Sequence, residues 1–109
     1  MLLNNPTYVE AARAFAARIL KEGGADAASR IRWAWRQALS RAPRADEMST
    51  VRALLERHVA EYQRDPQAAA ALAKVGLLPA LKDVDSAELA AWTNVARVIL
   101  NLHETITRS

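Results

Sequence analysis

The chain has 109 residues, of which 51% are hydrophobic and 25% are charged, and this balance predicts one folded domain and excludes intrinsic disorder. It contains no cysteine, which excludes disulfides, thiol nucleophiles, covalent haem attachment and cysteine-bound zinc. The net charge is +3, and the positive excess lies between residues 30 and 64, where eight arginines accompany four acidic residues. No membrane insertion is expected, because no run approaches the ~18 apolar residues of a spanning helix. The N-terminus lacks the basic-then-apolar order of a signal peptide.

Apolar residues recur at steps of three and four along most of the chain, and this spacing predicts an all-α fold. We expect a single domain, residues 1–109, folded as an irregular bundle of about five helices. The helices are predicted at residues 6–22, 28–41, 45–65, 66–75 and 86–103. The last of them is the most apolar long segment, and we expect the first three to pack against it. The predicted core is formed by Phe15, Trp35, Leu55 and Trp92.

Glycine, proline and short polar residues mark the boundaries of these helices. Pro6 is suited to a first helical turn, and Gly23-Gly24 ends the first helix. Asp26 or Ser29 can cap the second helix, which should stop near Ser40–Arg41 because Pro43 disfavours helical geometry at the residue before it. Ala45 or Asp46 begins the third helix.

Further along, Asp65 is expected to cap the fourth helix, with Pro66 as its first residue. Residues 77–83 show no helical period and predict a loop that turns leucines inward. Asp85 and Glu88 then match a capping box that opens the last helix.

No arrangement of residues points to intrinsic catalysis, a cofactor or a metal ion in this chain. His58 lies on the apolar face of the third helix, where a histidine with one hydrogen-bond partner is expected. His103 adjoins the end of the last helix, and Asp83 and Asp85 fall in a loop and a cap. One alternative is therefore an accessory domain that contributes Asp83, Asp85 or His103 to an enzyme site completed by another domain.

Trp33 lies off the apolar stripe of the second helix and is surrounded in sequence by arginines. Tryptophan and arginine are favoured anchors of protein interfaces, so we predict a contact patch. Its residues are Arg32, Trp33, Arg36 and Arg41. The alternative is that Trp33 belongs to a second buried face.

A second alternative is nucleic-acid binding, because the second and third helices and the basic turn at residues 40–44 resemble a helix-turn-helix. A reader helix presents arginine, asparagine or glutamine near its start. Here Asp46 and Glu47 occupy that start and would face phosphate, so the sequence disfavours nucleic acid as a partner.

Three blocks of sequence together carry a family resemblance. They are residues 2–6 (Leu-Leu-Asn-Asn-Pro); residues 30–41 with Pro43 and Glu47; and residues 88–104, with Trp92 and a Leu-Asn-Leu-His-Glu ending. In this order the chain resembles the C-terminal domain of a large family of unknown function that is prominent in planctomycetes and their relatives. The family has glycine where this chain has Ser40, and an aromatic residue where it has Thr105.

The resemblance implies a large exported parent protein, often with cytochrome c-type haem domains upstream, and therefore an extracytoplasmic location. It also implies that Met1 is not the original start, and it supplies no catalytic residue. We therefore expect a non-catalytic helical module, the C-terminal part of a larger protein, that packs on or recruits another domain.

Overall fold

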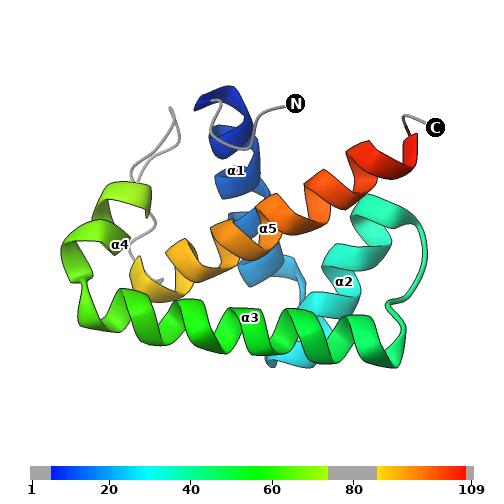
Figure 1. The fold of residues 1–109 in the computed structure, drawn as a ribbon, viewed down its shortest axis with the longest axis horizontal. Coiled ribbons are helices and arrows are strands. Elements are labelled where there is room, and N and C mark those ends of the chain that lie inside the picture. Colours follow the sequence, from blue (N-terminus) through cyan, green and yellow to red (C-terminus); the bar gives the residue numbers. More distant parts are fainter. Residues whose placement is uncertain (1–5, 74–85, 108–109) are drawn as a thin grey trace.

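The computed structural model describes residues 6–73 and 86–107, and these residues form helices joined by short turns (Figure 1). The helices are α1 Pro6–Glu22, α2 Ala27–Leu39, α3 Ala45–Arg64, α4 Pro66–Ala73 and α5 Ser86–Thr107. The described residues contain no β-strand, so the predicted all-α class is confirmed. None of the helices in this part of the chain is long and apolar enough to cross a membrane.

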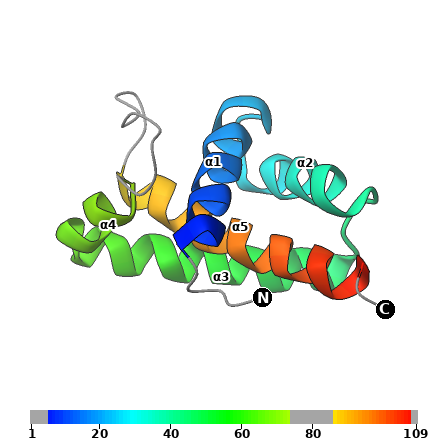
Figure 2. The same ribbon diagram turned by 90° about the horizontal axis from the view of Figure 1, so that it is seen from above.

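Helix α5 lies at the centre of the fold and contacts each of the other four helices. It crosses the face of α1 and runs beside α3, while α4 covers its first turns (Figures 1 and 2). The four predicted core residues, Phe15, Trp35, Leu55 and Trp92, are all buried in one hydrophobic cluster, as predicted. Each such side chain contributes roughly 1.5–3 kcal/mol by leaving water.

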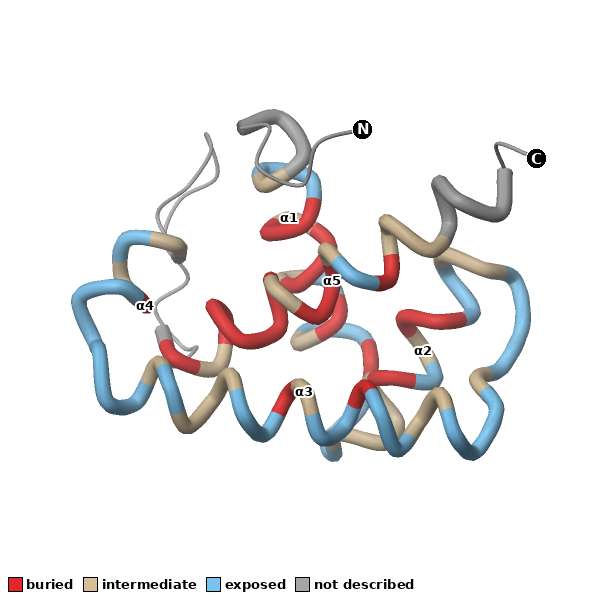
Figure 3. Tube along the Cα trace, in the orientation of Figure 1, coloured by how far each residue is buried: buried red, intermediate tan, exposed pale blue. Residues whose placement is uncertain are grey.

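Burial follows the helical period expected from the sequence. Figure 3 shows buried residues concentrated along α5 and along the sides of α1 and α2 that face it. The outer side of α3 is exposed and carries weak i,i+4 ion pairs, Arg52 with Glu56 and Arg57 with Glu61. This side is a solvated face that contributes little to stability.

Most helix ends lie at or near the predicted residues. Asp26 caps α2, and its carboxylate accepts a hydrogen bond from the Ser29 N–H at 3.0 Å. Asp65 accepts one from the Ala68 N–H at 3.1 Å, and Pro66 is the first residue of α4, as predicted. The predicted capping residue Asp85, the loop at residues 77–83 and the predicted end of α4 at residue 75 lie outside the described residues.

Two helix ends differ from the prediction. Helix α2 ends at Leu39, not at residue 41, because Ser40 adopts a left-handed conformation with φ 61° and its N–H bonds to the Arg36 carbonyl. Helix α5 continues to Thr107, four residues past the predicted end, because neither glycine nor proline follows His103.

One ion pair fixes the beginning of α5 against the turn between α1 and α2. The Arg30 guanidinium donates to Glu88 Oε1 at 2.7 Å and to the Gly24 carbonyl at 3.0 Å. Glu88 was assigned to a capping box by sequence, whereas its carboxylate here holds two helices together. At the same turn, Gly23 is buried, and the Arg30 Cα lies 3.1 Å from where a Cβ on Gly23 would be.

Candidate functional site

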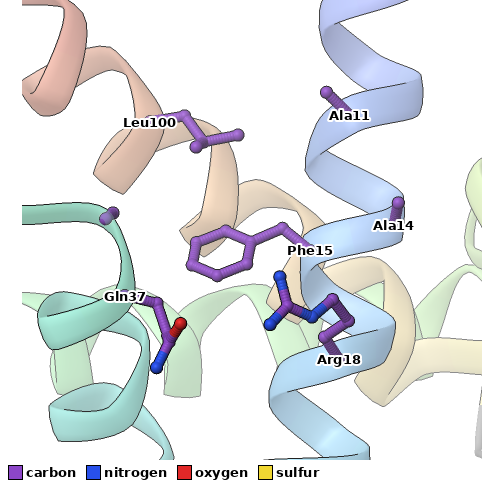
Figure 4. A pocket seen from close by; sticks show the side chains of 7 residues that line it. Ala11, Ala14, Phe15, Arg18, Gln37 and Leu100 are labelled. Atoms are coloured by element: carbon purple, nitrogen blue, oxygen red, sulfur yellow. The ribbon is translucent and has the colours of Figure 1, made fainter.

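A groove of about 420 Å³ opens on the surface where α1, α2 and α5 meet (Figure 4). Its lining is mostly apolar, and alanine is its commonest residue. The lining residues are Ala11, Ala14, Phe15, Arg18, Gln37, Ala38 and Leu100. We name this feature the α1–α2–α5 groove.

The groove exists because small side chains line the sides of α1 and α2 that face each other. Ala11, Phe15 and Arg18 recur at steps of four and three, which places them on one side of α1. Phe15 forms the floor and is 9% exposed, and Leu100 of α5 approaches it from across the gap (Figure 4). Ala11 and Ala38 are too short to fill the space between the helices.

Trp33 stands beside this groove and contacts its floor. The Trp33 ring centroid lies 6.2 Å from that of Phe15, and the Arg18 guanidinium lies over the Trp33 ring at 5.4 Å from its centroid. A cation over an indole face is attracted by the ring quadrupole, with about 0.5–1 kcal/mol at an exposed site. Arg18 also approaches Glu22 at 3.4 Å, with both side chains largely exposed.

The structure places the predicted contact patch on two different sides of α2. Arg32 and Arg36 are exposed beside the half-buried Trp33, and neither forms an ion pair with a residue that the structure describes. Trp33 therefore combines both sequence-based alternatives, because part of it packs on the core and part of it stays open. Whether these residues bind a partner remains a prediction.

Arg41 belongs to another environment. It forms two hydrogen bonds to the Glu47 carboxylate, at 2.8 and 3.0 Å, and its guanidinium lies 5.9 Å from the centroid of the buried Trp35 ring. Two residues turn an α-helix by about 200°, so Trp35 and Trp33 point in nearly opposite directions. Arg41 is thereby separated from the Trp33 side of the helix.

Glu47 closes the turn between α2 and α3. Its carboxylate accepts hydrogen bonds from the Arg41 side chain and from the Arg44 N–H, the latter at 2.9 Å. These bonds lower the pKa of Glu47 from 4.5 to about 2, and the hydrogen bond from Arg41 has the largest effect. Arg44 also lies 3.4 Å from Asp46, so the two turn arginines are compensated by acidic residues at the start of α3.

A second polar cluster joins α3 to α5. The Asn94 side-chain amide donates to the Tyr62 hydroxyl at 2.6 Å, and Arg97 donates to the Asn94 carbonyl oxygen at 3.3 Å. The His58 ring is stacked on Tyr62, and its buried Nδ1 has no hydrogen bond, contrary to the partner expected from sequence. The bond between Asn94 and Tyr62 links the two helices, and none of these residues lines the groove.

The described part of the chain holds no candidate metal site. Residues 6–73 and 86–107 contain no group of three or more histidine, aspartate or glutamate side chains that could hold a metal ion. Asp83 and Asp85 fall outside the described residues, and the side chain of His103 is not among those described. The proposed contribution of these three residues to an enzyme site stays a prediction.

Comparison with known proteins gives one match. Residues 1–55 match the family described as "PSD1: Protein of unknown function (DUF1553)". No curated protein and no solved structure matches the chain. The match includes α1, α2 and the first half of α3, so it covers two walls of the groove. It also covers the first two blocks of the sequence resemblance. The third block, residues 88–104, lies beyond it.

Proposed function

Since the chain belongs to the PSD1 family of proteins of unknown function (DUF1553), we propose that it is a non-catalytic helical module that packs against another domain of a larger protein. The α1–α2–α5 groove carries this proposal. The groove is a surface hollow with Arg18 in its lining and Trp33 beside it, and arginine and tryptophan are residue types that often anchor protein interfaces. Here Phe15 and Leu100 face that hollow, with Trp33 at its side.

The composition of the groove favours protein packing over binding of a small molecule. Ligand pockets combine an apolar lining with a few polar groups aimed at one point. Among the described residues that line the groove, the polar side chains are those of Arg18 and Gln37, and Arg18 is placed over Trp33. We propose no cofactor or metal for this chain.

The family resemblance supplies the proposed context. The parent protein would be a large exported polypeptide with haem or other modules upstream, and this chain would be its C-terminal module. The location would then be extracytoplasmic.

Nucleic-acid binding through α2 and α3 is the alternative function. The compensated charges of Arg41 and Arg44 count against it, because those cations are the ones nearest the helix-turn-helix-like turn. A salt-dependent shift of duplex DNA by the isolated chain would favour this alternative, and absence of binding at low salt would eliminate it.

The proposal is tested by hydrogen–deuterium exchange on two samples, the isolated chain and the polypeptide expressed from the complete native gene. We expect amides of α1 around Ala11–Arg18 and of α2 around Trp33–Ala38 to gain protection in the longer polypeptide. Amides on the outer side of α3, between Arg52 and Glu61, serve as the internal control and should not change. Equal exchange of α1 and α2 in both samples would disprove packing through the groove.

A further inference from the structure

We draw no further inference here: the strongest candidate, the α1–α2–α5 groove over Phe15, belongs to the site already described, and nothing in the structure shows what covers it.

Discussion

Two tryptophans of α2, two residues apart, occupy opposite kinds of environment. Trp35 is 1% exposed and is buried in the core, whereas Trp33 is half-buried at the side of the groove. Each has an arginine near its ring, Arg41 on Trp35 and Arg18 on Trp33, but Arg41 is also bound by Glu47 through two hydrogen bonds. The difference shows that one short helix has a side buried in the core and a side that stays partly open to solvent.

The lesson is that residue type alone does not identify a contact residue. Trp35 and Trp33 have the same intrinsic preference for burial, and the 200° between them decides which one reaches the centre of the fold. Four predictions sharpen this comparison, starting with the largest expected effect.

Truncation of a core tryptophan should be far more costly than truncation of the rim tryptophan. Trp92→Ala and Trp35→Ala should each lower the free energy of unfolding by roughly 3–5 kcal/mol, because each leaves a large cavity. Trp33→Ala, as the control, should cost roughly 1–2 kcal/mol, because its ring is only partly withdrawn from water. Denaturant unfolding measures all three, and an unchanged midpoint for Trp92→Ala would refute the core assignment.

Removal of the polar link between α3 and α5 should cause the second-largest loss of stability. Asn94→Ala removes the 2.6 Å hydrogen bond to Tyr62 and should cost about 1–2 kcal/mol. Tyr62→Phe and the double variant complete a cycle that isolates the pair from the rest of each side chain. A coupling energy near zero would show that the two groups are merely adjacent.

The Glu47 turn should contribute a pH-dependent effect. The pKa of Glu47 is lowered in the folded chain to about 2, so its stabilisation is complete above about pH 4.5 and is lost as the pH falls towards 2. Glu47→Gln should therefore lower Tm by a few degrees at pH 7. Near pH 2 the Tm of this variant should equal that of the parent chain. Glu56→Gln removes a looser pair, at 3.8 Å, and should change Tm little at any pH.

The smallest expected effect is a gain in stability. Ser40 holds a left-handed conformation, with φ 61°, that costs a side-chain-bearing residue energy and that glycine adopts freely. Ser40→Gly should raise the free energy of unfolding by about 0.5–1 kcal/mol. Ser49→Gly, at an exposed position inside α3, is the opposite control and should destabilise. A lower free energy of unfolding for Ser40→Gly would contradict the left-handed conformation of Ser40.

The elements of the fold were largely predictable from the sequence. The five helices, the caps at Asp26 and Asp65 and the burial of Trp35 and Trp92 all follow from local periodicity and capping chemistry. The end of α2 was placed two residues too late. Pro43 indicated that the helix must stop, and only the backbone shows that Ser40 stops it.

The site was less predictable, because it depends on how helices far apart in sequence are arranged. Periodicity gives the apolar side of each helix but not the angle at which two helices cross, so neither the groove nor the Arg30–Glu88 pair could be foreseen. Trp33 was singled out correctly as lying off the core stripe. Arg41 was grouped with Trp33 on the assumption that residues close in sequence lie on the same side of the helix. The turn after Leu39 instead places Arg41 near Trp35.

Gly23 controls more than the end of a helix. At the turn between α1 and α2, a Cβ at Gly23 would lie 2.5 Å from the Ile19 carbonyl oxygen and 3.1 Å from the Arg30 Cα. Any side chain there would force the turn between α1 and α2 to shift. The way α1 and α2 are joined therefore depends on the absence of a Cβ at one position, well away from Ala11 and Gln37 in the groove.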